Sequence, residues 1–567
     1  MNNSTWKLGE LNFPKPDLRA VEDINEDVVR RIQDAFDGDD VLEVIFEHNE
    51  LLRKSNDLLE VSLIRQSQDT TNEKYEEERR WVYEHLPLFD KAAVEFNEAI
   101  YNSPYSEYIR EKLGPMYFIK MDIEKKNYCE ANIKLTQREA ALKEEYQRLI
   151  ATCRVEIDGE ERSFLGLQRL WAHEDREVRK AAFKAFSDFM RDHEAELEGI
   201  FDELIKIRTE IGKNLGYDNY LPVAYLNRGR ISYGPEDVAN FRKQVQEEIV
   251  PLCSELFERQ KERLGVDELM AYDETIVFPD GNAKQLGDAD YMMKQIVDMF
   301  HEMSPETSEF IDFMVEHELM DCEIRPGKAA REYSTSLMSR KAPFVFTFFD
   351  GSAKSVKTLL GAMGHAFASY RAMRKQPIKE YYSSSADIME IYVMSMTLFS
   401  NRYADRFFGD DVKKYEYYNL HDLMTFIPFG VAVDEFQHIC YEHPKLTPKE
   451  RSMEWRKLEE KYMPWRKYDE DDEFMARGGF WYHKQHIFLY PLYYIEYPLA
   501  TINAMEMYQK YMEHPGTAWQ EYLTLADLGG SKQYLETLEL ANITPVFKDG
   551  AVAKSIGYVK DVLINSF

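Results

Sequence analysis

The chain has 567 residues, of which 102 are acidic and 71 basic, giving a formal net charge of −31. Hydrophobic residues make up 44% of the chain, which is typical of globular proteins and excludes a disordered one. A chain of this length can bury a large core and form more than one lobe. Because no surplus of basic side chains exists to neutralise phosphates, we expect no nucleic-acid partner and no binding to anionic membranes.

The cysteines and the apolar segments favour a cytoplasmic protein. The sparse, odd set of cysteines contains no C-x-x-C pair and is typical of reduced thiols; its members are Cys129, Cys153, Cys253, Cys322 and Cys440. The N-terminal residues contain no apolar segment of the kind found in signal peptides. The most apolar stretch, 486–508, is interrupted by Glu496 and Glu506, so we expect a buried aromatic helix there and no membrane span.

Helical periodicity dominates the pattern in chain order. In 201–215 the apolar residues recur on one helix face, and Gly216 follows as a C-cap. Similar periodicity predicts further helices over 23–66, 72–103, 120–152, 176–199, 236–264 and 287–319. The chain is therefore predicted to be mainly α.

Strand signals are few. Asp158-Gly159 between two short runs predicts a hairpin within 154–162. The stretch 342–349 is β-branched and aromatic and ends before Asp350-Gly351, so it predicts a strand that leads into the following helix.

That following helix carries an incomplete catalytic motif. In H-E-x-x-H the two histidines share one helix face and bind zinc, and the glutamate is the general base. Here the five positions hold Gly361, Ala362, Met363, Gly364 and His365. The second histidine is present, whereas the first histidine and the glutamate are missing.

A carboxylate follows on the next predicted helix. Glu390 lies 25 residues after His365, where a third zinc ligand would be expected. Its neighbours include Ile388, Met389 and Ile391, which favours a partly buried carboxylate, and such a group needs a partner.

These blocks together resemble peptidase family M3, specifically its oligoendopeptidase F and Pz-peptidase branch. The matching stretches run through nearly the whole chain and are Gly159–Arg162, Arg208–Tyr217, Lys341–Ser352, Gly364–Phe367, Glu390–Met396, Pro428–His438, Arg477–Trp481, His486-Ile487 and Tyr493–Tyr497. The resemblance implies a two-lobed, zincin-like helical fold with a deep central channel and a small β-sheet beside the site. It also implies an N-terminal helical lobe over 1–197 and a catalytic-like domain over 198–567.

The resemblance assigns roles to individual residues. His365 and Glu390 match two zinc ligands, while Gly361 replaces the first ligand and Ala362 replaces the base. His486, Tyr493, Tyr494 and Tyr497 match residues that contact substrate, although each tyrosine is equally well explained by core packing. Tyr333 belongs to the wall along which an extended peptide would add as a strand.

Further departures surround the site. A glycine-rich stretch of the family is replaced by Ala330-Arg331-Glu332-Tyr333-Ser334-Thr335, and Tyr392 stands where the family usually has histidine. The segment His317–Asp321 begins like H-E-x-x-H but ends in aspartate, and we interpret it as part of the scaffold. Loss of a general base alone costs about 10²–10⁴ in rate, and loss of a ligand removes the metal that activates water.

Three hypotheses follow from this sequence. The preferred one is a catalytically inactive M3 pseudopeptidase that binds oligopeptides in its channel, with zinc absent or weakly bound. The second is an active zinc-dependent oligoendopeptidase with a rebuilt metal site, for which no replacement ligand is visible. The third is a non-catalytic protein that acts through a protein partner, which the sequence does not name.

Overall fold

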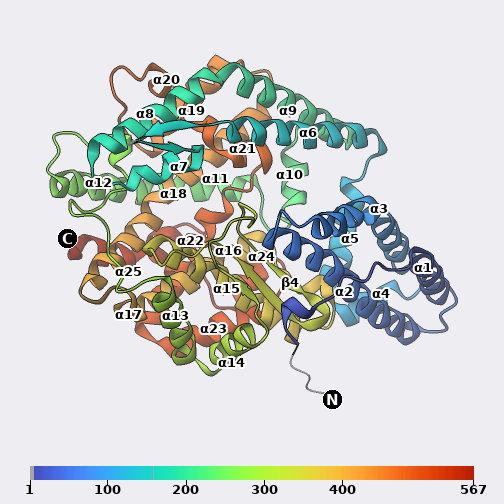
Figure 1. The fold of residues 1–567 in the computed structure, drawn as a ribbon. Coiled ribbons are helices and arrows are strands. Elements are labelled where there is room, and N and C mark those ends of the chain that lie inside the picture. The colour runs from blue at the N-terminus through green and yellow to red at the C-terminus, as the bar shows by residue number, and fades with distance from the viewer. Residues whose placement is uncertain (1–5, 158) are drawn as a thin grey trace. The chain divides into compact units, whose positions relative to one another are not determined.

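The computed structural model describes residues 6–157 and 159–567. The chain folds into two compact units, each assembled from separate segments. Unit 1 comprises Met1–Asp122, Lys284–Gly409 and Lys510–Asn542, and unit 2 comprises Ile123–Ala283, Asp410–Gln509 and Ile543–Phe567. The colours of Figure 1 show this interleaving, because each unit contains segments from distant parts of the chain.

Helices form most of unit 1. They are α1 (Leu18–Gln33), α2 (Gly38–Gln68), α3 (Glu73–Tyr101), α4 (Ser106–Leu113), α5 (Pro115–Asn127), α13 (Ala289–Met303), α14 (Pro305–Glu316), α15 (Ala353–Lys375), α16 (Ala386–Phe399), α17 (Asp405–Phe408), α23 (Pro515–Leu528) and α24 (Tyr534–Leu540). The prediction of a mainly α protein is confirmed.

A small sheet in unit 1 leads into α15. It has the order β3-β5-β4, with β3 (Met320–Asp321) parallel and β4 (Tyr333–Leu337) antiparallel to β5 (Ala342–Phe346). The strand predicted over 342–349 is confirmed, but in the structure it ends three residues earlier, at Phe346. Ser352 then caps α15 by accepting a hydrogen bond from the Ser355 backbone N–H at 3.2 Å.

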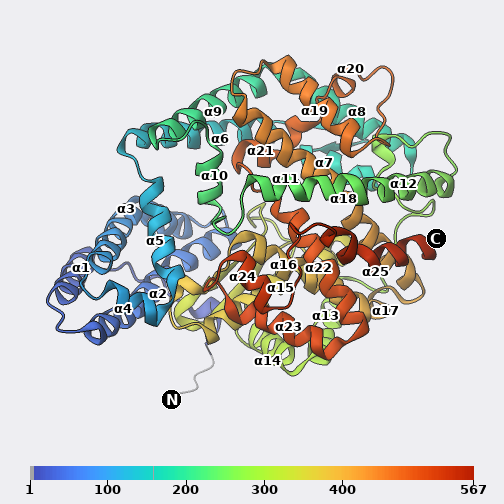
Figure 2. The same ribbon diagram turned by 180° about the vertical axis from the view of Figure 1, so that it is seen from behind.

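Unit 2 is also helical. Its helices are α6 (Ile133–Ala151), α7 (Phe164–Arg169), α8 (Arg176–Asp192), α9 (Glu194–Asn214), α10 (Leu221–Asn227), α11 (Pro235–Gln244), α12 (Val250–Leu264), α18 (Val412–Glu442), α19 (Pro448–Tyr462), α20 (Glu473–Ala476), α21 (Gln485–Leu489), α22 (Glu496–Glu513) and α25 (Ala551–Ser566). A π-helical turn at Val245–Ile249 joins α11 to α12, and Figure 2 shows these helices beside α18.

Several predicted helices are divided in the structure. The range 23–66 falls on α1 and α2, which separate where Asp37 caps α2, and 287–319 falls on α13 and α14, which separate at Ser304 and Pro305. The ranges 120–152 and 176–199 are likewise each divided between two helices. Apolar periodicity continues across such breaks, whereas the capping residues end the hydrogen-bonded ladder.

Other local predictions are confirmed. The range 72–103 corresponds to α3, and 236–264 to α11 and α12 with the π turn between them. Helix α9 ends at Asn214, and Gly216 has φ +86°, the left-handed conformation of a C-cap glycine. Strands β1 (Val155–Ile157) and β2 (Glu160–Arg162) pair antiparallel as the predicted hairpin. Its turn residue Asp158 lies outside the described residues.

Helices α15 and α16 of unit 1 pack closely together and lie side by side in Figures 1 and 2. A Cβ atom at Gly364 would lie 2.6 Å from the Tyr392 carbonyl oxygen and 2.7 Å from Met396 Cβ. Only glycine allows the two backbones to approach so closely at this position. Gly364 of the degenerate motif therefore allows the close contact between the two helices.

Substitution of Gly364 by alanine should destabilise the protein by about 1–3 kcal/mol, because the added methyl group meets backbone that cannot move aside cheaply. The control is Gly557→Ala in α25, where an added Cβ meets no atom within 4 Å and should stabilise by about 0.5–1 kcal/mol. Urea denaturation followed by circular dichroism measures both. Equal midpoints for the two variants would contradict the close-contact assignment.

Candidate functional site

Gly361 and Gly364 of the degenerate motif lie on the face of α15 that packs against α16. Gly361, Met363 and Gly364 are buried, and Ala362 and His365 are half-buried. Burial lowers the pKa of His365 and so favours its neutral form. Helix α16 supplies Glu390, which is also half-buried. The two expected ligand residues are thus carried by two helices in direct contact.

The space of the first ligand position is already filled. A Cβ at Gly361 would lie 2.9 Å from Val393 Cγ1 and 3.5 Å from Thr397 Oγ1. The Thr397 hydroxyl donates to the Val393 carbonyl at 2.9 Å, which fixes that side chain on its own helix. Because valine is stiff at χ1, a side chain at position 361 would have to displace it.

The residues present do not fit a three-ligand zinc site. Gly361 supplies no donor atom, and Ala362 supplies neither a ligand nor a base. Among residues 6–157 and 159–567, no group of three or more histidine, cysteine, aspartate or glutamate side chains is placed to hold a metal ion. Catalytic zinc sites normally use three protein ligands, and this pair of helices offers two candidates.

The other departures are absorbed into the fold of unit 1. The Tyr392 hydroxyl donates to the Leu525 carbonyl of α23 at 3.0 Å and lies 2.9 Å from Ser384 Oγ. Arg331 donates to Gln66 Oε1 at 2.6 Å and to Ser67 Oγ at 2.8 Å. These side chains are held by α2 and α23 rather than projecting freely.

Tyr333 begins β4 and pairs in register with Phe346 of β5, whose ring stacks on it with centroids 5.1 Å apart. Helix α2 contacts β4: Asn56 donates to the Ser336 carbonyl at 3.3 Å, and Thr335 donates to Glu60 at 2.6 Å. Part of this strand is therefore already engaged by α2.

The segment His317–Asp321 is scaffold, as the sequence indicated. The His317 ring stacks on Trp6 with centroids 4.4 Å apart. Asp321 forms ion pairs with Arg325 at 2.6 Å and with Lys328 at 2.9 Å. Neither residue has the environment of a metal ligand.

The structure brings the four remaining candidate residues together in unit 2. The His486 ring lies 4.8 Å from that of Tyr494, 5.9 Å from that of Tyr493 and 6.0 Å from that of Tyr497. Burial, with a smaller effect from Lys484, lowers the pKa of His486 to about 3. His486 Nδ1 is buried and has no hydrogen-bond partner within the described residues.

An aromatic cavity of about 260 Å³ lies beside this cluster, within unit 2. Its walls include Trp171, Phe183, Phe257, Ala271, Glu274, Thr275, Val277, Tyr418, His421, Asp422, Thr425, Phe426, Phe429, Arg466, Phe480, His483 and Tyr494. It shares Tyr494 with the His486 cluster.

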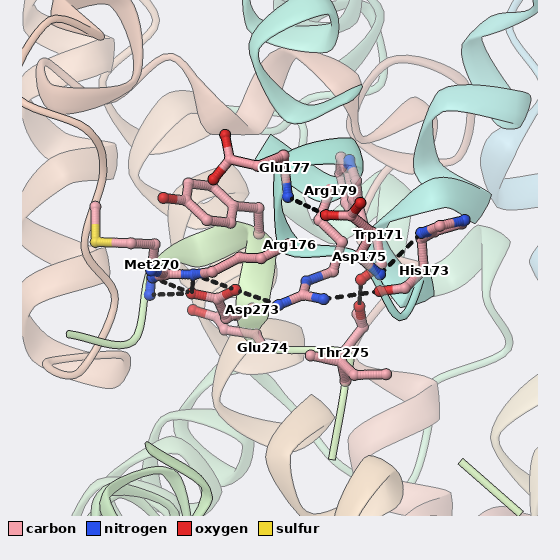
Figure 3. A network of polar contacts seen from close by, with 12 residues as sticks. Trp171, His173, Asp175, Arg176, Glu177, Arg179, Met270, Asp273, Glu274 and Thr275 are labelled. Carbon is pink, nitrogen blue, oxygen red and sulfur yellow. Dashed lines mark hydrogen bonds and ion pairs between the residues drawn. The ribbon is translucent and has the colours of Figure 1, made fainter. Parts of the chain in front are cut away.

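A network of polar contacts around Asp273 holds a loop that lines this cavity, and Figure 3 shows the network. Asp273 is fully buried and pairs with Arg176 and Arg179, each at 2.7 Å, and it also accepts from the Met270 backbone N–H at 3.1 Å. Thr275 donates to the Trp171 carbonyl. These bonds fix the loop before and after Asp273, and that loop supplies Ala271, Glu274 and Thr275 to the cavity.

Lys484 is a functional candidate that the sequence pattern did not single out. Its Nζ lies 4.3 Å from the ring centroid of Tyr494 and 5.5 Å from that of Phe429. Burial lowers its pKa from 10.5 to about 7. The sequence carries no signal for this residue, because its neighbours His483, Gln485 and His486 are themselves polar.

Comparison with known proteins assigns the family. The model of peptidase family M3 matches residues 169–555, and that of the peptidase M3 N-terminal domain matches residues 8–128. The chain therefore belongs to peptidase family M3.

Individual relatives agree with this assignment. The structure of PZ peptidase A with inhibitor 2 is 37% identical, with a TM-score of 0.90 over 98% of this chain and 99% of that one. A Bacillus anthracis protein provisionally described as oligoendopeptidase F is 33% identical, with a TM-score of 0.85 over 98% of both chains. An oligoendopeptidase F homolog of Borreliella burgdorferi is 21% identical over 65% of this chain, and the match spans 62% of that relative's length.

Restoring the first ligand should require two changes. Gly361→His alone should leave zinc binding weak, because Val393 occupies the space, whereas Gly361→His combined with Val393→Ala should bind zinc at least about 100-fold more tightly than the wild type. Loss of an outer-shell partner alone costs 10–100-fold, and a direct ligand should contribute at least as much. Competition with a chromophoric chelator measures the affinities, with Val393→Ala as the control. Wild-type affinity equal to that of the double variant would contradict the donor assignment.

Lys484 should make stability depend on pH. Between about pH 7 and 10.5 the unfolded chain holds a proton that folded Lys484 has released, so this residue's contribution to the free energy of unfolding rises with pH. Relative to the wild type, Lys484→Met should therefore be most stabilised at pH 6–7 and least near pH 10. Urea midpoints measure this difference, with exposed Lys445→Met as the control. A difference that does not change with pH would show that Lys484 is not shifted.

Proposed function

We propose that this M3 oligoendopeptidase-like protein binds oligopeptides without hydrolysing them by the zinc mechanism of its family. The observation that carries the proposal is the pair Gly361 and Ala362, with Val393 Cγ1 in the space where a ligand side chain at position 361 would begin. A missing ligand and a missing base each remove a necessary part of metal-assisted hydrolysis. The surrounding helices keep the packing of the family.

Peptide binding is supported by features that do not need a metal. The His486 cluster presents three tyrosine rings and a buried imidazole nitrogen without a partner. Aromatic rings with polar ends bind peptides through both apolar contact and hydrogen bonds. The family acts on peptides, so a peptide is the ligand class that the ancestry of these residues favours.

The proposal also includes a cytoplasmic location, which agrees with five unpaired cysteines. The division of the chain at residue 197 remains a prediction about its sequence domains. Within the described residues, no helix is both long and apolar enough to cross a membrane.

The protein should not cleave a pool of quenched-fluorescent peptides of about 5–15 residues with zinc present. Its rate should equal that of His365→Ala and should not change with chelator, because both base and first ligand are missing. A family member with an intact H-E-x-x-H is the positive control for the assay.

Two outcomes separate the hypotheses. Turnover that disappears in His365→Ala and with chelator would contradict the proposal and identify a rebuilt zinc site. Absence of both turnover and retention of peptides on the protein would contradict the peptide-binding part and favour a role through a protein partner.

A further inference from the structure

Lys484 carries a charge that the described residues do not neutralise. Its ammonium group lies against the rings of Tyr494 and Phe429, and no carboxylate among residues 6–157 and 159–567 pairs with it. The residue as a whole is half-buried. A charge held in this way is costly unless an opposite charge joins it.

The neighbouring groups do not offset the charge of Lys484. Arg466 also lies near the Phe429 ring, but Glu274 neutralises it through two hydrogen bonds, of 2.9 and 2.5 Å. His483 stacks on the same ring, and the Lys484 charge contributes to lowering the pKa of His483 and of His486. The carboxylate of this group, Glu274, pairs with Arg466, which leaves Lys484 without an acid although the chain as a whole has a net charge of −31.

A second polar group nearby is also without a partner. His486 Nδ1 is buried and makes no hydrogen bond within the described residues. Its ring lies 4.8 Å from the ring of Tyr494, the same ring that Lys484 contacts at 4.3 Å. An ammonium group and an imidazole nitrogen thus lie next to the same tyrosine, and the described residues give neither a hydrogen-bond partner.

We propose that Lys484, with His486 beside it, forms a carboxylate-binding site that anchors the C-terminal carboxylate of a bound oligopeptide. An ammonium group binds a carboxylate by a charge-assisted hydrogen bond. The tyrosine rings supply apolar contact for the residues that precede the carboxylate. This inference rests on the proposed function, since it takes the ligand to be a peptide.

The test uses acetylated, randomised hexapeptides that lack aspartate and glutamate, in one pool with free C-terminal carboxylates and in another with C-terminal amides. The full-length protein is incubated with each pool, and retained peptides are quantified by ultrafiltration and mass spectrometry. A third pool of amides that contains glutamate distinguishes a side-chain carboxylate from the C-terminal one. Lys484→Met is compared with Lys445→Met, which removes an exposed lysine elsewhere in unit 2.

The wild type and Lys445→Met should retain the free-acid pool about tenfold better than the amide pool, as expected for a hydrogen bond to a charged group. Lys484→Met should lose this preference while still retaining peptides weakly. Equal retention of the acid and amide pools by the wild type would overturn the inference and leave peptide binding intact. Retention of neither pool would overturn both this inference and the proposed function, and preference for the glutamate pool alone would overturn the C-terminal assignment.

A second measurement does not depend on the folding of a variant. Binding of the best-retained acid peptide to the wild type at pH 8 should take up protons, because pairing with a carboxylate favours the charged form of Lys484. Calorimetry in buffers of different ionisation enthalpy measures this uptake. Binding without proton uptake would overturn the role of Lys484, and Lys484→Gln provides a second neutral variant if Lys484→Met does not fold.

Discussion

The contact between α15 and α16 is the constraint on which the altered site depends. Gly364 lets the α15 backbone approach the Tyr392 carbonyl, and Val393 then reaches the place where a side chain at position 361 would begin. Because protein interiors are close-packed, even one added methyl group disturbs the neighbouring side chains. Loss of the first ligand is therefore more than a missing atom, because the neighbouring helix has filled its space. Restoration of the first ligand would require coordinated changes on both helices.

The second unit retains a different kind of site. Buried Asp273, paired with two arginines, fixes the loop that supplies one wall of the aromatic cavity. A buried ion pair is weak evidence for net stability, but removing one partner is costly. We therefore interpret the network as one that positions the loop around Asp273. Beside the cavity, the His486 cluster and Lys484 offer apolar and polar contacts that need no metal.

Much of this could be predicted from the sequence, and the exceptions have physical causes. The helical class and the strand before α15 were predicted from periodicity and from β-branched and aromatic residues. The substrate-contacting role of His486 and the three tyrosines was inferred from the family resemblance and stays a prediction. The breaks at Asp37 and Ser304 were not predicted, since apolar periodicity continues across capping residues. The filling of the ligand space by Val393 and the absence of an acid paired with Lys484 among the described residues depend on contacts between segments. The spacing of residues within one segment does not predict contacts between segments.

The α15–α16 pair offers too few donors to hold zinc. Anomalous diffraction at the zinc absorption edge, from crystals grown with added zinc, tests it most directly. We expect no ordered zinc peak between His365 and Glu390. A peak at full occupancy there, with a third protein ligand completing the coordination, would contradict it and show that the site had been rebuilt.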